Sequence, residues 1–134
     1  MKNYLPLMLF CFLLITGCSH QKKMTPEQLM QDYKLTRQKI DNGEIKFAGG
    51  DGTSFDKAVV IIGAKSPRFG IKAEYIYLEM HYGKPNVDWR LVQQSLAFDD
   101  NKFFDILEIV IIKSGKIIEI YYDISDFRKY RGRK

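Results

Sequence analysis

The chain has 134 residues, with 21 Lys and Arg, 16 Asp and Glu, and two cysteines. This length allows one domain with a modest core. Five of the basic residues lie within the last seven positions, and residues 18–127 carry 15 basic against 16 acidic side chains. A nucleic-acid-binding domain would have a basic face interleaved with aromatic residues, so this nearly neutral body argues against a nucleic-acid partner.

Residues 1–17 have the layout of a cleaved signal peptide. Lys2 gives a basic start, and a largely apolar run follows from Tyr4 to Ile15. This length suits the apolar segment of a signal peptide and is shorter than the roughly 20 apolar residues of a membrane-spanning helix. The run closes with Ile15-Thr16-Gly17-Cys18, where two small residues precede a cysteine.

The motif Ile15-Thr16-Gly17-Cys18 resembles the lipobox of bacterial lipoproteins. The resemblance implies cleavage before Cys18, an S-diacylglycerol group on its thiol and an N-acyl chain, such as palmitate, on its new amine. Two or three such chains anchor a protein durably, since each buried methylene contributes about 0.8 kcal/mol. The alternatives are an ordinary secretory signal with an incidental cysteine and a buried N-terminal helix.

The lipobox resemblance also bears on location and on cysteine chemistry. It implies a lipid-anchored protein of the cell membrane. Ser19 stands where an aspartate would resemble an inner-membrane retention signal, so the outer membrane is favoured if the host has two membranes. Because Cys11 would leave with the signal, the mature chain has no pair of cysteines for a disulfide.

The rest of the chain divides into three parts. Residues 18–24 are predicted to be a polar tether, residues 25–127 a single domain, and residues 128–134 a basic tail. The tail has two interpretations: a solvated terminus, or a segment drawn to anionic headgroups at about 1 kcal/mol per basic residue.

Two helices are predicted from their ends. Thr25-Pro26-Glu27-Gln28 combines an N-cap hydroxyl, a proline in the first turn and a glutamine that completes a capping box, and Asn42-Gly43 ends this helix. The segment 71–77 alternates like a strand, yet Ser66-Pro67 before it and Gly83 after it are typical of a helix start and stop. We therefore expect a second helix there.

Strand-like runs make up most of the remainder. They cover residues 58–62, 89–98, 103–112 and 117–123, with a turn over Asp99–Lys102, a two-residue turn at Ser114-Gly115 and a final turn over 124–127. The predicted fold class is α+β: an antiparallel sheet of about four strands packed against two helices.

The stretch GGDGTSFDKAVVI, which starts at Gly49, is rich in glycine. Its glycines precede a strand, whereas phosphate-binding loops open a helix after one, so we predict a surface turn capped by Asp51 and Thr53. Together with AEYIYL and the closing YYDISDF, this stretch is similar to a group of small bacterial proteins with a GDGSS-like opening. That resemblance supports one domain and implies no activity.

The sequence contains no recognisable catalytic set. It has no G-x-S-x-G or H-E-x-x-H motif, and His81 is the one histidine outside the tether. Asp99 and Asp100 are adjacent carboxylates, but they lie on a predicted turn. We therefore predict a protein that is not an enzyme and uses no cofactor or metal.

These features favour a lipid-anchored binding or structural module of the envelope. Asp51, Thr53, Asp99 and Asp100, together with the turn at Ser114–Lys116, are the candidate contacts for an envelope protein partner, either an assembly or a toxin that the protein neutralises as an immunity partner. Two rival classes are a hydrolase whose site no motif reveals and a small-ligand carrier with an aromatic groove between helix and sheet. The aromatic residues considered for that groove are Tyr75, Tyr77, Tyr82, Trp89, Tyr121 and Tyr122.

Overall fold

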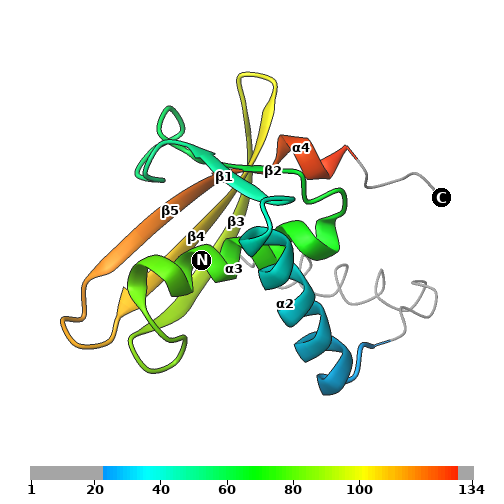
Figure 1. Cartoon of the computed structure of the whole chain (residues 1–134). Coiled ribbons are helices and arrows are strands. Elements are labelled where there is room, and N and C mark those ends of the chain that lie inside the picture. The colour runs from blue at the N-terminus through cyan, green and yellow to red at the C-terminus, as the bar shows by residue number, and fades with distance from the viewer. Residues whose placement is uncertain (1–22, 130–134) are drawn as a thin grey trace, which may run out of the picture.

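The computed structural model describes residues 23–129, which form one α+β domain (Figure 1). The elements run in the order α2 (Pro26–Asp41), β1 (Lys46–Gly49), β2 (Val59–Ile62), α3 (Pro67–Tyr82), β3 (Trp89–Asp99), β4 (Lys102–Ile111), β5 (Ile117–Asp123) and α4 (Ser125–Arg128). The predicted signal peptide, the lipobox with Cys18, most of the tether and residues 130–134 of the basic tail lie outside the described residues.

Both predicted helices are confirmed, with the expected caps. The Thr25 hydroxyl accepts from the Gln28 amide at 3.2 Å, and the Gln28 side chain accepts from the Thr25 amide at 2.9 Å. In α3 the Ser66 hydroxyl accepts from the Phe69 amide, and Gly83 ends the helix with φ +95°. Local hydrogen bonding of this kind needs no tertiary context, which is why the sequence predicts it well.

The sheet has five strands in the order β1-β2-β5-β4-β3. Three of its pairings are antiparallel, while β2 pairs with β5 in parallel through Val59–Tyr122 and Val60–Asp123. The prediction of an antiparallel sheet of about four strands is thus confirmed as to class and corrected in two respects. It lacked the short edge strand β1, and it lacked the parallel pair, which no local turn signal announces.

The two hairpins differ in how well the sequence predicts them. Asp99 pairs with Lys102, so Asp100 and Asn101 form a two-residue turn in which both have positive φ, the conformation of a tight hairpin. For the second hairpin, the prediction of a turn at Ser114-Gly115 alone is wrong. There β4 ends at Ile111 and β5 begins at Ile117, so the loop has five residues.

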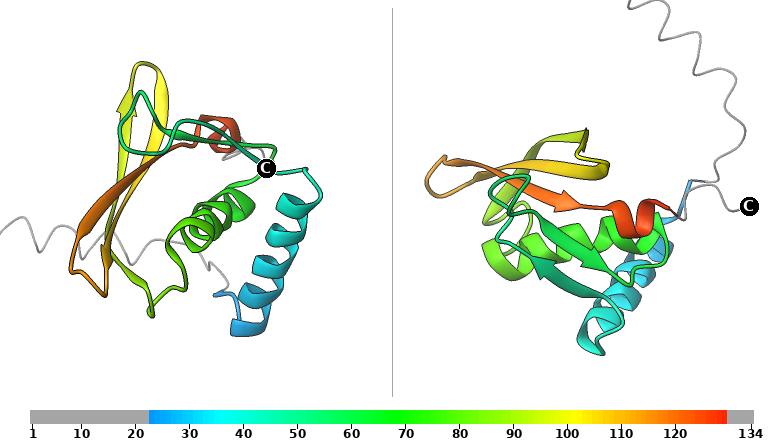
Figure 2. Two further views of the ribbon diagram at one scale, coloured as in Figure 1. Left: turned by 60° about the vertical axis from the view of Figure 1, so that its left-hand side comes forward. Right: turned by 90° about the horizontal axis from the view of Figure 1, so that it is seen from above.

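The domain is layered (Figure 2): α3 lies against one face of the sheet, and α2 lies on the outer side of α3. Ala73, Leu78, Leu107, Ile109 and Tyr122 are among the residues that close the core between α3 and the sheet, each at most 2% exposed. The Tyr122 hydroxyl donates to the backbone carbonyl of Glu74 at 3.0 Å, which fixes α3 on β5.

Candidate functional site

The predicted contact residues at the glycine-rich loop and the first hairpin lie at the same end of the sheet (Figures 1 and 2). The prediction that Asp51 and Thr53 cap the loop is confirmed: the Asp51 carboxylate accepts from the Thr53 amide at 3.1 Å and from its hydroxyl at 2.7 Å. Phe55 packs this loop onto the sheet, with its ring 5.0 Å from that of Phe104. Asp99 and Asp100 are exposed on the neighbouring turn.

The remaining candidate features do not join this group. The turn that contains Ser114–Lys116 lies at the opposite end of the sheet (Figure 1). His81, in the last turn of α3, stacks on Tyr77 with ring centroids 4.1 Å apart. Nor do the six aromatic residues line one groove. Tyr77, Trp89 and Tyr122 belong to the core, whereas Tyr121 contacts Phe55 on the other face of the sheet.

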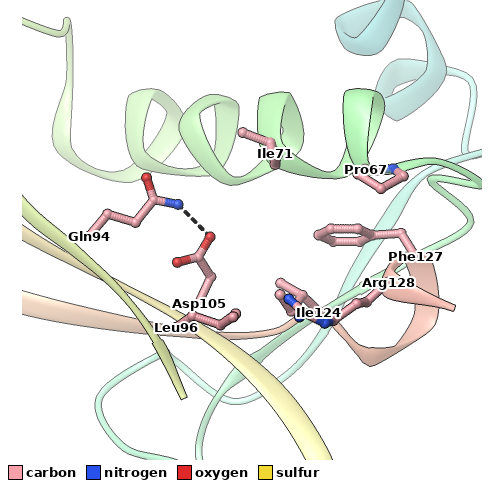
Figure 3. Close-up of a pocket in the computed structure, with 8 residues that line it drawn as sticks. All are labelled: Pro67, Ile71, Gln94, Leu96, Asp105, Ile124, Phe127 and Arg128. Carbon is pink, nitrogen blue, oxygen red and sulfur yellow. Dashed lines mark hydrogen bonds between the residues drawn. The ribbon is translucent and has the colours of Figure 1, made fainter. Parts of the chain in front are cut away.

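A pocket of about 290 Å³ lies elsewhere, between the first half of α3, the sheet and α4 (Figure 3). Its apolar walls are shared between helix and sheet, and its polar groups are few. It is lined by Pro67, Ile71, Gln94, Leu96, Asp105, Ile124, Phe127 and Arg128. Apolar walls with a small number of placed polar groups are typical of small-molecule sites.

A β-bulge in β3 brings Gln94 into this pocket. The register with β4 shifts between Leu91 and Gln93. Before the bulge Leu91 pairs with the buried Ile109, and after it Gln94 pairs with the buried Leu107. The residues facing α3 therefore change from odd to even positions, and Gln94 becomes the diagonal neighbour of Asp105. Its amide donates to the Asp105 carboxylate at 2.6 Å.

A second acid, Glu74, lies in the core next to the pocket. It follows Ile71 by three residues on the same side of α3, and its side chain is 0% exposed. Among the described residues, no hydrogen-bond donor reaches either of its carboxyl oxygens. The charged group that acts on it is the Asp105 carboxyl, which raises the pKa of Glu74 in addition to the effect of burial.

The two acids differ in how strongly their surroundings favour the neutral form. Burial raises the pKa of Glu74 well above its usual range, and the charge of Asp105 raises it further. Burial also raises the pKa of Asp105, but the hydrogen bond from Gln94 and the charge of Arg128 oppose that rise. The neutral form is therefore favoured at Glu74 more than at Asp105.

One wall of the pocket is formed by α4 and the residue before it, through Ile124, Phe127 and Arg128. Gly70 lets this turn approach α3, since a Cβ there would lie 2.5 Å from the Phe127 ring. The Arg128 guanidinium lies over the Phe103 ring, 4.2 Å from its centroid. It acts on Asp105 through its charge, and within residues 23–129 no ion pair of 4 Å or less joins the two groups. The pocket thus carries one negative and one positive group.

Sequence reasoning missed Glu74, Gln94 and Asp105 as a group. The available signal was the change of apolar positions along β3, from Trp89 and Leu91 to Leu96 and Phe98, which is what a one-residue bulge produces. The position of Glu74 between Ala73 and Tyr75, on the apolar side of a predicted helix, was a second signal of a buried acid.

Searches for metal ligands and for membrane spans give no candidate in the described part of the chain. No cluster of three or more His, Cys, Asp or Glu side chains there could hold a metal ion. No described helix is long and apolar enough to cross a bilayer. No family model, curated protein or solved structure matches the chain.

Proposed function

We propose that this protein is a lipid-anchored module of the bacterial cell envelope whose domain binds a small ligand in the pocket beside Asp105. The observation that carries the proposal is a pocket that contains Asp105 and adjoins Glu74, a buried acid to which the described residues supply no hydrogen bond. Such an acid costs stability, and groups of this kind concentrate at functional sites. An acid pair alone does not define a reaction, so a module without catalytic activity stays our prediction.

The anchor is inferred from the lipobox resemblance at Cys18. Lipidation there would leave a short tether before α2, which begins at Pro26. A tethered domain is confined to a thin layer above the bilayer, so its effective concentration toward envelope ligands and proteins is high. Modest affinity then suffices for function.

Mass spectrometry of the mature N-terminus tests the anchor. We expect a peptide that starts at Cys18 and carries the mass of a diacylglycerol and a further acyl chain. Cys18→Ala should move the protein out of the membrane fraction. An unmodified peptide that starts at Lys2, or cleavage at another position, would refute lipidation.

A pocket-filling variant tests ligand binding. The protein, solubilised in mild detergent, is dialysed against a mixture of small metabolites, and the retained compounds are identified by mass spectrometry. Ile71→Trp places a large ring in the pocket and should abolish retention. Ile117→Trp is the matched control, because Ile117 is 58% exposed at the far end of the sheet. Equal retention by all three proteins, or by none, would contradict the proposed function.

A protein partner is a second candidate, favoured by the clustering of Asp51, Thr53, Asp99 and Asp100 at one end of the sheet. The partner would be an envelope assembly or a neutralised toxin. Crosslinking in intact cells should recover it with wild type and lose it with Asp99→Lys/Asp100→Lys. The charge reversal Lys34→Glu on the exposed side of α2 serves as the control. Recovery unaffected by the aspartate changes would exclude this surface.

A further inference from the structure

We infer that the pocket beside Asp105 takes a small zwitterion of the amino-acid class, with its ammonium group on Asp105, its carboxylate on Arg128 and an aliphatic side chain against the apolar walls. This inference rests on the proposed function of the pocket as a ligand site and names the ligand's chemistry. It follows from four properties of the site: its charges, its remaining hydrogen-bond capacity, its walls and its size.

The charges of the site favour a ligand that carries both signs. Asp105 is 6% exposed, so its negative charge has little water around it. Arg128 lines the same pocket without an ion pair to Asp105 in the described chain. A simple cation would be attracted by Asp105 but repelled by Arg128. A simple anion would be attracted by Arg128 but repelled by Asp105. A zwitterion compensates both groups.

Asp105 keeps room for a further donor. A carboxylate has about four acceptor positions. The Gln94 amide occupies one of them at 2.6 Å. An ammonium group supplies a donor for another. On the other side, a carboxylate suits the planar guanidinium of Arg128, which can donate two parallel hydrogen bonds.

Glu74 has a defined part in this site. Burial and the charge of Asp105 raise its pKa, which favours its neutral form beside Asp105. A neutral Glu74 leaves the pair with one negative charge and not two. One charge matches a single ammonium group. A divalent metal ion would call for both carboxylates ionised and for further ligands, and no three-residue cluster of such ligands occurs in the described chain.

The walls and the size limit the rest of the ligand. Ile71, Leu96 and Phe127 surround the polar group with apolar side chains, as Figure 3 shows. They offer contact to an aliphatic side chain and none of the hydrogen bonds that a sugar or a nucleobase requires. The volume of about 290 Å³ lies just below the range typical of ligand pockets, roughly 300–1,000 Å³. A single amino acid suits this volume better than a larger molecule.

Three related ligands test the inference. Leucine, 3-methylbutylamine and 4-methylpentanoate share one side chain and differ in whether they carry both charges, only the ammonium or only the carboxylate. Binding to the detergent-solubilised protein is measured by isothermal titration calorimetry. We expect leucine to bind at least about tenfold more tightly than either single-charge analogue, which corresponds to the loss of one well-placed charged contact.

Three variants assign the two ends of the ligand. Asp105→Asn should weaken leucine at least about tenfold and leave 4-methylpentanoate unchanged, whereas Arg128→Gln should weaken leucine and leave 3-methylbutylamine unchanged or tighter. Asp41→Asn, an exposed acid at the end of α2, is the control and should change nothing. The zwitterion assignment is overturned if leucine binds no better than the amine, or if Arg128→Gln has no effect.

The pocket itself is tested separately. If leucine fails to bind while another retained metabolite is still lost in Ile71→Trp, the proposed ligand site stands and the amino-acid assignment falls. If no compound is retained in a manner sensitive to Ile71→Trp, the ligand site falls and the assignment falls with it.

Discussion

Four acids are buried among the described residues, and two of them, Asp32 and Glu74, differ clearly in what surrounds them. Asp32 on α2 is 2% exposed and is held by Arg68, which donates through two nitrogens, and by Lys72 at 3.6 Å. Glu74 on α3 is 0% exposed and has no cation and no donor among the described residues. The hydrogen bonds from Arg68 lower the pKa of Asp32, whereas burial raises that of Glu74. One acid joins two helices, and the other costs stability at the edge of a pocket.

This difference indicates which of these two buried acids is associated with function. A buried charge that is paired and hydrogen-bonded has a structural explanation. An acid without compensation persists only where something other than stability retains it, and here it adjoins a pocket that contains the buried carboxylate of Asp105. The contrast leads to opposite expectations when each acid is changed.

The largest effect is expected at Asp32. Asp32→Ala removes the carboxylate that joins α2 to Arg68 and Lys72 on α3, so it should lower the midpoint of thermal unfolding by at least about 5 °C. Circular dichroism during heating provides the measurement. Asp41→Ala, an exposed acid on the same helix, should leave the midpoint nearly unchanged. Equal midpoints for the two variants would mean that the Asp32 cluster adds nothing to the packing of α2.

The next effect concerns Glu74 and has the opposite sign. Its pKa is raised by folding, so the folded state keeps a proton that the unfolded state releases above the ordinary value of 4.5. Stability is therefore lost as the pH rises from 4.5 to the folded pKa. Glu74→Gln has no proton to release, and its advantage over wild type should grow by about 1.4 kcal/mol per pH unit across that window.

Urea unfolding at a series of pH values measures this difference. Below pH 4.5 the two proteins should be separated by a constant amount, because Glu74 is then protonated in both states. Asp56→Asn, which neutralises an exposed carboxylate in the glycine-rich loop, should not reproduce the divergence. Parallel profiles for wild type and Glu74→Gln would show that Glu74 is ionised in the folded protein.

This contrast also separates what the sequence could predict from what it could not. The caps at Thr25, Ser66 and Gly83 are local, and they located α2 and α3 to within a residue. The hairpin at Asp100 and Asn101 was equally local. In each case the interacting groups lie within a few residues of one another, so a short stretch of sequence includes both partners of the interaction.

The features that were missed depend on distant pairings. Strand β1 is four residues long, and its partner β2 begins ten residues after β1 ends. The parallel pair of β2 and β5 joins residues about sixty positions apart. The site is of the same kind: Glu74, Gln94 and Asp105 come from three elements and meet only because a bulge shifts the register of β3. Reasoning from local patterns selected exposed turns as candidate partner contacts and did not find this site.

A smaller effect is expected at Gln94, which supports the charge on Asp105. Its amide lowers the pKa of Asp105 through a hydrogen bond of 2.6 Å. Gln94→Ala should therefore raise the pKa of Asp105, which carbon-detected NMR of the Asp105 carboxyl can follow during a pH titration. Gln93→Ala is the matched control, because the neighbouring glutamine points to the other face of the sheet and hydrogen-bonds Ser95. An Asp105 titration unchanged by Gln94→Ala would remove Gln94 from the site.

The smallest effect is expected at another buried acid, Asp123, whose surroundings lie between those of Asp32 and Glu74. It is 7% exposed, accepts from the Ser125 amide at 3.0 Å, and has one cation, Lys102, at 3.7 Å. The Lys102 side chain is 56% exposed, so water screens the pair, and Lys102→Ala should cost no more than about 1 kcal/mol of unfolding free energy. Urea unfolding of wild type and Lys102→Ala in low salt and in 1 M NaCl measures this cost. The difference in unfolding free energy between the two proteins should shrink in salt, because charges that far apart are then screened.

A loss of unfolding free energy above about 2 kcal/mol that salt does not change would contradict this expectation. Asp123 would then resemble Asp32, an acid that the fold requires to be paired with a cation. A loss within the expected range would instead show that backbone donors alone can hold an acid at the rim of this sheet, which is the support that Glu74 lacks.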